Sequence, residues 1–486
     1  MLFKKGEVPM KKGIALLLLL AVCLLNYVQH DVPDQDPFAF TDYSRLHPVK
    51  VERVVQGHEE QQLVALIQEA KQKHLTVSIA GKRHSQGGHT YYKDGIVVDM
   101  TSFNRILSLD PAAKTIRVQA GATWADIQNA VNPYGLSVRT MQSQNIFTVG
   151  GSISINAHGR DIRNGSLIQS VQSFRLLNAD GDIIEVSRSE HAELFPLVLG
   201  GYGLFGIILD VTLSLTDNEM YTITSDAMSV EAYSTYFKNH VLANPAIRLH
   251  IARLSVAPDT FLSDMYSMNY QVDPSVPLQG NDRLKQRESW VVPSKLLFNL
   301  NRSFTWGRDA FWAWQKRYFA AQQGRTISRN NAMRSESEFM EDRQAGENDV
   351  LQEYFIPVGN FAAFVESFRD VLRQEDLNLL NITVRYVNRD EEAALSYAQA
   401  DMFALVCLYH VPLAAGDQSQ VTAAMQRILD AVLQHNGTYY LPYAPYPKLE
   451  QFRAAYPGQA AFFQMKDRYD PGHVFMNYFY EDYKGE

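Results

Sequence analysis

Three glycine-containing stretches have the spacing to bring polypeptide backbone against a ligand. The first is Ala80–Gly88 (A-G-K-R-H-S-Q-G-G), which directly follows a predicted strand over Val77–Ile79. A turn of this kind exposes converging backbone N–H groups that can hold a diphosphate, and it places His84 beside that ligand. In the second stretch, Thr148–Ser152, the paired glycines carry no Cβ and let the backbone approach a ligand closely.

The third stretch, Gly200–Ile208 (G-G-Y-G-L-F-G-I-I), contains the spacing G-x-G-x-x-G. This fingerprint holds a dinucleotide when a strand precedes it and a helix follows, because the helix N-terminus then meets the pyrophosphate. Here we predict the reverse order, with a helical stretch over Glu190–Leu199 and a strand over Gly206–Leu215. We therefore discount a nicotinamide site of the Rossmann type.

Composition excludes several other classes of function. His84 and His89 have no carboxylate or cysteine at ligand spacing, and only Cys23 and Cys407 are present, so we expect no metal site and no structural disulfide. The 486 residues are 46% hydrophobic and 20% charged, which is typical of a globular protein of two domains. A net charge of −8 does not favour nucleic-acid binding, which needs a clustered basic surface.

The elements that must position the glycine stretches alternate between strand and helix from Val51 to Leu215. Period-2 and period-3.6 patterns and turn residues mark them. We predict strands over Val51–Val55, Gly95–Met100, Thr115–Ala120, Leu136–Val138, Val171–Leu177 and Ile183–Val186, and helices over Glu59–Lys73 and Trp124–Val131. After residue 215 the patterning is mixed. One stretch there, Arg302–Phe319, is either an amphipathic helix that faces the core or a helix that rests on a membrane.

The N-terminus predicts a membrane or export segment. Lys4, Lys5, Lys11 and Lys12 precede an apolar run over Gly13–Leu25. This run is either an uncleaved signal anchor, which we favour, or a cleaved signal peptide of a soluble exported protein. The positive-inside rule places the body of an anchored chain on the extracytoplasmic, periplasmic side.

In their order along the chain, these stretches resemble the FAD-binding domain of the vanillyl-alcohol-oxidase, or p-cresol methylhydroxylase (PCMH), family. Near the C-terminus, Tyr469–Asn477 is similar to the D-P-x-x-x-F tail that returns to the flavin domain in this family. The resemblance implies an α+β fold with a two-subdomain PCMH-type FAD-binding domain, an α+β substrate domain, and a C-terminal tail that returns to the FAD domain. The segments we expect are residues 1–28 (signal anchor or signal peptide), 29–47 (tether), 48–215 (FAD-binding domain), 216–430 (substrate domain) and 431–486 (returning segment).

The resemblance also implies which residues contact FAD. His84 falls where many members carry a histidine bonded to the flavin 8α-methyl group, although Lys82 and Arg83 replace the usual intervening pair. The alternative is an unbonded loop histidine with FAD held non-covalently. His158 corresponds to a histidine that packs on the flavin. The expected cofactor-binding residues are Ala80, Gly81, Lys82, Arg83, His84, Ser85, Gln86, Ser143, Thr148, Val149, Gly150, Gly151, Asn156, His158, Ile207 and Tyr440.

Among family members, the stretches Thr383–Tyr386 and Asn436–Pro442 look most like aldonolactone and alditol oxidases and decaprenylphosphoryl-ribose oxidase. Lactone oxidases carry an E-x-R pair beside the flavin, and here Thr383-x-Arg385 keeps only the arginine. We expect Arg385 to stabilise negative charge on reduced flavin or on a substrate oxygen. The alternative for Arg385 is a structural salt bridge with Asp390. A lysine that follows the Y-L-A step in the ribose oxidase is replaced by Tyr443.

The sequence thus predicts a membrane-anchored, FAD-dependent oxidoreductase that oxidises a CH–OH group by hydride transfer to flavin. The expected substrate is a polyol, sugar, aldonolactone or lipid-linked sugar, and the electron acceptor is oxygen, a quinone or another carrier. The alternatives are a flavin-binding electron carrier without turnover and a flavin-dependent reductase. His84 counts against the reductase, since those relatives lack it.

Overall fold

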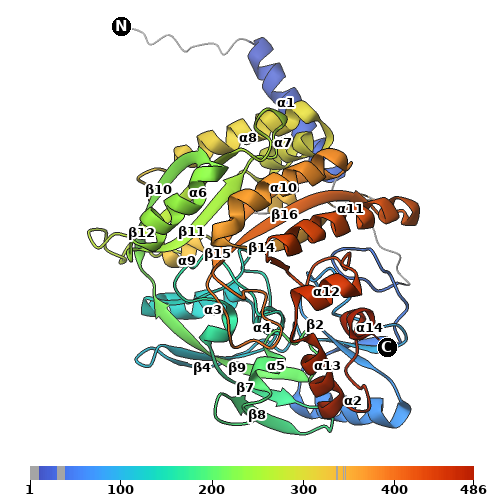
Figure 1. The fold of residues 1–486 in the computed structure, drawn as a ribbon. Helices are drawn as coiled ribbons and strands as arrows, with labels where there is room; N and C mark the ends of the chain where they lie inside the picture. The colour runs from blue at the N-terminus through green and yellow to red at the C-terminus, as the bar shows by residue number, and fades with distance from the viewer. Residues whose placement is uncertain (1–9, 30–38, 335–337, 343, 345, 486) are drawn as a thin grey trace.

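Three β-sheets with helices around them make up the fold (Figure 1). The computed structural model describes residues 10–29, 39–334, 338–342, 344 and 346–485. The two smaller sheets use strands that precede residue 218, and the large sheet uses strands that follow residue 219. This mixture of helices and sheets agrees with the predicted α+β class.

The smallest sheet positions the first glycine stretch. Its strands pair in parallel in the order β1 (Arg53–Gln56), β3 (Ile96–Asp99) and β2 (Val77–Ala80). The central strand β3 is apolar because helix α2 (Glu60–Lys73) covers one face of it, with Leu63 and Ile67 in the same buried cluster. The stretch Ala80–Gly88 begins where β2 ends, at the carboxyl edge of this sheet.

The second sheet is antiparallel and positions the other two stretches. Its order is β4 (Ile106–Asp110), β5 (Thr115–Gln119), β9 (Ile207–Asp217), β7 (Val171–Leu177) and β8 (Ile183–Ser187), and β6 (Leu136–Val138) also pairs with β9. Helices α3 (Trp124–Val131), α4 (Val149–Ser154) and α5 (Phe195–Val198) connect these strands. The second glycine stretch forms the start of α4, and the third leads into β9.

The large sheet has eight strands in antiparallel pairings. Its order is β13 (Thr326–Ser328), β10 (Met220–Ser229), β12 (Asp264–Val272), β11 (Ile247–Leu254), β15 (Asn378–Val387), β16 (Met402–Pro412), β14 (Glu347–Pro357) and β17 (Thr438–Tyr439). The helices around it are α6 (Val230–Tyr236), α7 (Val291–Ser303), α8 (Thr305–Ala320), α9 (Arg329–Ala332), α10 (Phe361–Gln374) and α11 (Ala415–Gln434). In Figure 1, α10 and α11 lie across β14 and β16.

The C-terminal segment lies against the smallest sheet. It contains α12 (Leu449–Ala455), α13 (Gln459–Tyr469) and α14 (Tyr478–Lys484). Between the last two helices the backbone runs beside β2, with hydrogen bonds from Val77 N to Val474 O (2.6 Å) and from Met476 N to Val77 O (3.0 Å). The buried Asp470 carboxylate accepts hydrogen bonds from the N–H groups of Val474 and Phe475, which fixes this turn.

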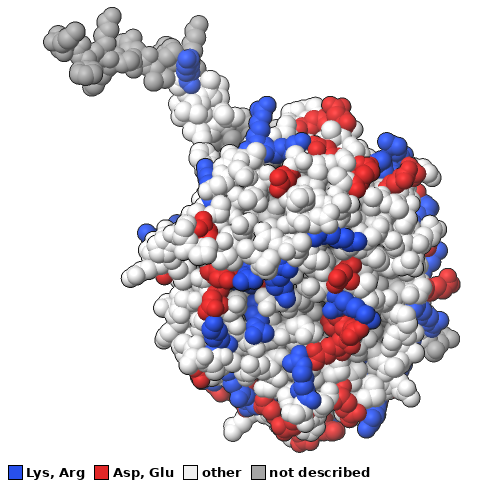
Figure 2. Space-filling view, turned by 60° about the vertical axis from the view of Figure 1, so that its left-hand side comes forward, with Lys and Arg blue, Asp and Glu red and all other residues white. Residues whose placement is uncertain are grey.

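Helix α1 (Met10–Gln29) projects from the body of the molecule and exposes most of its leucines (Figures 1 and 2). It is long and apolar enough to cross a membrane, a property that signal sequences near an N-terminus share. Its C-terminal end packs on α7, where Asn299 Nδ2 donates to Asn26 Oδ1 (2.8 Å). Lys4, Lys5 and residues 30–38 of the expected tether lie outside the described residues.

Most elements predicted for residues 51–215 are confirmed within one or two residues. Strand β4 was not predicted, because its side chains are largely exposed and lack a buried alternation. The helix predicted over Glu190–Leu199 is shorter in the structure, where only α5 is helical. In the predicted stretch Arg302–Phe319, α8 buries Phe311 and Trp312, as the core-facing interpretation expects. The same helix also exposes Trp306 and Trp314 on its other side.

Candidate functional site

A cavity of about 310 Å³ lies between the glycine stretches and one face of the large sheet. The sheet side chains that line it are two residues apart on each strand, because alternate residues of a strand point to one face. They are Ile251 and Arg253 on β11, Asn381, Thr383 and Arg385 on β15, Val406 and Leu408 on β16, and Asp349, Leu351 and Glu353 on β14. On the opposite face, Tyr354 packs on Phe364 and Phe368 of α10.

The first glycine stretch forms the wall opposite the sheet. Arg83 adopts a left-handed conformation with φ of 56°, and the backbone N–H groups of residues 81–85 donate to no other described residue. Successive free N–H groups in such a turn form a concave site for an anion. A Cβ on Gly81 would lie 2.2 Å from Thr148 Oγ1, so this glycine allows the first and second stretches to touch.

His84 lies in this wall between two aromatic rings. Its imidazole stacks on Tyr43 at 4.6 Å between ring centroids and meets Phe147 edge-on at 4.7 Å. Burial, assisted by the charge of Lys82, lowers the pKa of His84 to about 4. The ring is therefore neutral near neutral pH, with a free lone pair that can form a covalent bond.

Tyr43 belongs to a segment that we expected to be part of the tether. Residues 39–47 instead contact the body, since Tyr43 N donates to Arg83 O (2.9 Å) and Gly88 N donates to Asp42 Oδ2 (2.8 Å). Burial raises the pKa of the Asp42 carboxyl group to about 6. The polar, proline-containing composition of residues 29–47 does not reveal these specific contacts.

Most residues that the sequence predicted to bind the cofactor line this one cavity, and Arg385 lines it with them. They are Ala80, Gly81, Lys82, Arg83, His84, Ser85, Gln86, Ser143, Thr148, Gly150, Gly151, His158 and Tyr440. Three others do not line it. Val149 is packed inside α4, Ile207 is in the core between the two smaller sheets, and Asn156 donates its amide to Asp390 (2.8 Å).

One end of the cavity is acidic and aromatic. Glu353 is buried, and its Oε1 lies 2.8 Å from His158 Nε2. Tyr443 shares a hydrogen bond with Glu353, and burial together with this carboxylate raises the pKa of Tyr443 well above its ordinary value. Tyr440 holds the adjacent wall by donating to Ile155 O (3.0 Å).

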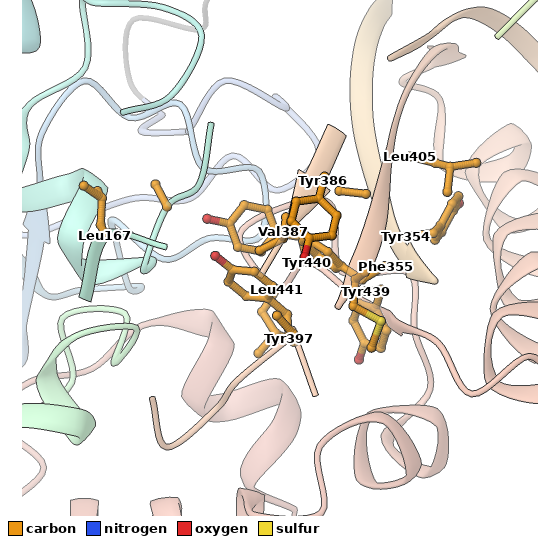
Figure 3. Close-up of a cluster of buried hydrophobic side chains, with 14 of the residues drawn as sticks. Leu167, Tyr354, Phe355, Tyr386, Val387, Tyr397, Leu405, Tyr439, Tyr440 and Leu441 are labelled. Atoms are coloured by element: carbon orange, nitrogen blue, oxygen red, sulfur yellow. The ribbon is translucent and has the colours of Figure 1, made fainter. Parts of the chain in front are cut away.

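The aromatic layer behind this end joins the large sheet to the C-terminal segment (Figure 3). Phe355 stacks on Tyr397 at 4.4 Å, and Tyr397 meets Tyr440 at 5.0 Å. His158 contacts all three of these rings edge-on or tilted. These packed rings fix the position of the imidazole beside the Glu353 carboxylate.

The other end of the cavity is basic. Arg385 Nη2 donates to Ser143 Oγ (2.6 Å), and Arg253 donates to Thr383 Oγ1. Asp390, the alternative partner expected for Arg385, instead accepts hydrogen bonds from Asn156 and Ser166. The guanidinium of Arg385 is thus held toward the cavity rather than in that salt bridge.

Sequence reasoning missed Glu353, Arg253 and Arg160, which all line the cavity. A usable signal was present for two of them. Glu353 stands in the apolar strand sequence L-Q-E-Y-F-I-P, and Arg253 stands in I-A-R-L. A charged residue in a strand that is apolar on both faces is either paired or functional, because burying an unpaired charge is costly.

A possible cation site borders the cavity. Among the described residues, Asp342, Asp349 and His410 bring ligand atoms within 4.8 Å of one another. Arg302 already pairs with both carboxylates, at 2.5 Å from Asp349 Oδ2 and 3.5 Å from Asp342 Oδ2. Because this guanidinium already pairs with the two carboxylates, we assign no metal to the cluster.

Comparison with known proteins decides the class of ligand. The sequence profile of a family described as FAD binding domain matches residues 51–187. The chain contains a PCMH-type FAD-binding domain. The FAD-binding domain therefore includes the first glycine stretch with His84 and the second stretch at the start of α4.

Curated relatives match part of the chain. L-gulonolactone oxidase of Bos taurus is 30% identical over 174 residues, which is 36% of this chain and 39% of that protein. Decaprenylphosphoryl-beta-D-ribose oxidase of Mycolicibacterium smegmatis is 33% identical over 148 residues, 30% of this chain and 32% of that protein. Mitochondrial L-galactono-1,4-lactone dehydrogenase of Arabidopsis thaliana is 29% identical over 179 residues, 37% of this chain and 29% of that protein. The chain thus spans less than half the length of each of these relatives.

The residues present fit FAD. The unpaired N–H groups of residues 81–85 suit its pyrophosphate. Gly150 and Gly151 also line the cavity, and Gly150 lets α4 pack closely on Ala120, since a Cβ there would lie 2.7 Å from the Ala120 Cβ. The cavity continues from this wall past His84 to the side chains of the large sheet.

Proposed function

We propose that this chain is an FAD-dependent oxidoreductase that oxidises a CH–OH group of a polyol, sugar, aldonolactone or lipid-linked sugar. The electrons taken from the substrate then pass to oxygen, a quinone or another carrier. The observation that carries the proposal is that one cavity joins the wall of the FAD-binding domain to a buried carboxylate, Glu353, and a half-buried guanidinium, Arg385, on the facing sheet. A carboxylate can take a hydroxyl proton, and a guanidinium can stabilise negative charge that develops in the reaction.

The bound flavin supplies the hydride acceptor, its N5 atom. Glu353 then serves as the base that takes the hydroxyl proton of the substrate, because it is buried, faces the cavity and shares a hydrogen bond with Tyr443 beside His158. Arg385 stabilises negative charge that develops on the substrate oxygen or on the cofactor. Ser143 positions Arg385 by accepting its hydrogen bond.

His84 is the residue that we assign to a covalent link with the flavin. Its imidazole is neutral and lies on the cavity wall beside the pyrophosphate-binding turn. Acid precipitation of the purified protein, followed by in-gel fluorescence, tests the link. Fluorescence that stays with the chain supports it, and complete release of flavin into the supernatant refutes it.

We assign residues 48–215 to the FAD-binding domain, residues 216–430 to the substrate domain and residues 431–486 to the segment that returns to the FAD domain. The pairing of the tail with β2 supports the return, whereas β17, near the start of this segment, pairs with β14 of the large sheet. The large sheet, which carries Glu353, Arg385 and Arg253, supplies the substrate side of the cavity.

Helix α1 anchors the chain in the membrane, and the globular body of the protein lies on the extracytoplasmic side. The helix has 20 residues, or about 30 Å of length, which matches the apolar thickness of a bilayer. Its end at Asn26 is fixed to α7, and α8 packs on α7 with Trp306 and Trp314 exposed. Aromatic side chains favour the membrane interface, so we place this side of the molecule at the bilayer surface.

Anaerobic reduction of the flavin tests the proposed reaction. The FAD-loaded chain, mixed without oxygen with polyols, sugars and aldonolactones, is expected to lose its yellow colour with at least one of them. A chain that none of these alcohols bleaches is the result expected of an electron carrier or a reductase.

A further inference from the structure

Three arginine side chains meet at the basic end of the cavity. Arg160 follows α4, Arg253 lies on β11 and Arg385 lies on β15, and all three line the cavity. Burial lowers the pKa of Arg253, and the nearby guanidinium groups of Arg160 and Arg385 lower it further. The three positive charges are therefore close enough to repel one another.

Two of these arginines have no carboxylate partner. Arg253 donates to Thr383 Oγ1 and Arg385 donates to Ser143 Oγ, and neither forms a salt bridge within the described part of the chain. Nε of Arg385 is buried without a hydrogen-bond partner among the same residues. Arg160 Nη1 donates to Ala332 O (2.9 Å).

The two arginines that are almost fully buried among the described residues both pair with carboxylates. Arg302 pairs with Asp349 at 2.5 Å, and Arg329 pairs with Asp161 at 2.6 Å. Arg253 and Arg385 are half-buried, and they stand with Arg160 around one cavity, where like charges repel one another. Because neither Arg253 nor Arg385 has a carboxylate partner within the described residues, we infer that the cluster takes its partner, an anion, from outside the chain.

The sheet register sets where this anion lies relative to the proposed base. Arg253 pairs with Thr383, Thr383 pairs with Val406, and Val406 pairs with Glu353, so the two charged residues stand at opposite ends of one row across four strands. With neighbouring strands about 4.8 Å apart, their Cα atoms are about 14 Å apart. A substrate that bridges the row can be held at one end and lose a proton at the other.

We propose that Arg253, with Arg160 and Arg385 near it, binds an oxyanion group of the substrate, a phosphate or a carboxylate. This inference rests on the proposed oxidation for the orientation of the substrate, and it narrows the substrate to a sugar or polyol that carries such a group. Guanidinium groups suit this role because their planar donors match the oxygens of both anions.

Equilibrium binding to the FAD-loaded chain tests the proposal without requiring turnover. The probes are D-ribose 5-phosphate, D-ribonate and D-ribose, which share a polyhydroxylated frame and differ in the anion. Binding is measured by calorimetry and by the change in flavin absorbance. We expect one or both anionic probes to bind at least about 10-fold more tightly than D-ribose, which corresponds to one charge-assisted hydrogen bond.

Variants on strand β11 distinguish the effect of the arginine cluster on binding from the effect of general surface charge. Arg253→Met is expected to weaken binding of the anionic probe about 10- to 100-fold and to change binding of D-ribose less than about 2-fold. Arg253→Lys keeps a charge and retains part of the affinity. Arg248→Met is the matched control, since Arg248 lies on the same strand, is partly exposed and pairs with Glu219 at the surface.

Three results would overturn the proposal. One is that neither anion binds more tightly than D-ribose. Another is that Arg253→Met weakens the binding of all three probes equally. The third is that Arg253→Met loses its FAD, because the cluster then serves the cofactor. Failure of the proposed oxidation is seen separately, as a flavin that no alcohol bleaches while the anions still bind.

Discussion

Replacement of Glu353 by glutamine changes the proposed base and little else. Glutamine has the same shape, and its amide oxygen can still accept the hydrogen bond from Tyr443. The amide cannot take the substrate proton, however. General bases contribute about 10²- to 10⁴-fold to rate, which is about 2.7 to 5.4 kcal/mol of transition-state stabilisation. We expect Glu353→Gln to slow flavin reduction by this factor while FAD content stays unchanged.

Stopped-flow absorbance under anaerobic conditions measures this step directly, with a substrate that bleaches the parent chain. Two controls accompany the variant. Glu347→Gln changes an exposed carboxylate on the same strand, and it is expected to leave the rate unchanged. Tyr443→Phe removes one hydrogen bond to Glu353 and is expected to slow the reaction less than about 10-fold. A Glu353→Gln rate within about 3-fold of the parent rate would refute the role of this carboxylate as base.

Three further predictions concern the cofactor link, pH and the membrane. His84→Ala is expected to release all its flavin into the acid supernatant, whereas a retained fluorescent band would contradict the link. Burial lowers the pKa of His250 to about 4, so the unfolded chain binds a proton that the folded chain does not between about pH 6.5 and about pH 4. Stability then rises with pH across this window, and in urea titrations His250→Gln is expected to reduce the slope by up to about 1.4 kcal/mol per pH unit; an unchanged slope would contradict the pKa shift. In vesicles, lipids with brominated acyl chains are expected to quench the fluorescence of the parent chain more than that of the double variant Trp306→Phe, Trp314→Phe, and equal quenching would place these residues away from the bilayer.

The sequence predicted the FAD-binding domain well because its signals are local. The turn at Ala80–Gly88 follows directly after a short buried strand, and the glycines at 150 and 151 stand at the start of a helix. The residue types there are dictated by backbone conformation and by close approach, which neighbouring residues reveal. The same reasoning placed His84, Thr148 and Gly150 at one cavity, where they are found.

The substrate side could not be predicted in the same way. Arg253 and Glu353 stand 100 positions apart, and only the antiparallel register of β11, β15, β16 and β14 places them in one row. Their local sequences show a charge within a buried strand but not its partner. Likewise, Tyr43 reaches His84 through a loop whose composition is that of a tether. Long-range strand order and loop contacts of this kind depend on the whole chain.

The most direct test of the proposed reaction is the flavin spectrum of the purified, FAD-loaded chain during anaerobic titration with polyols, sugars, sugar phosphates and aldonolactones. We predict that at least one of these alcohols converts the oxidised spectrum completely to that of reduced flavin, and that it does so far more slowly in Glu353→Gln. A chain that carries FAD but is reduced by none of them would contradict the proposal that this cavity oxidises a CH–OH group.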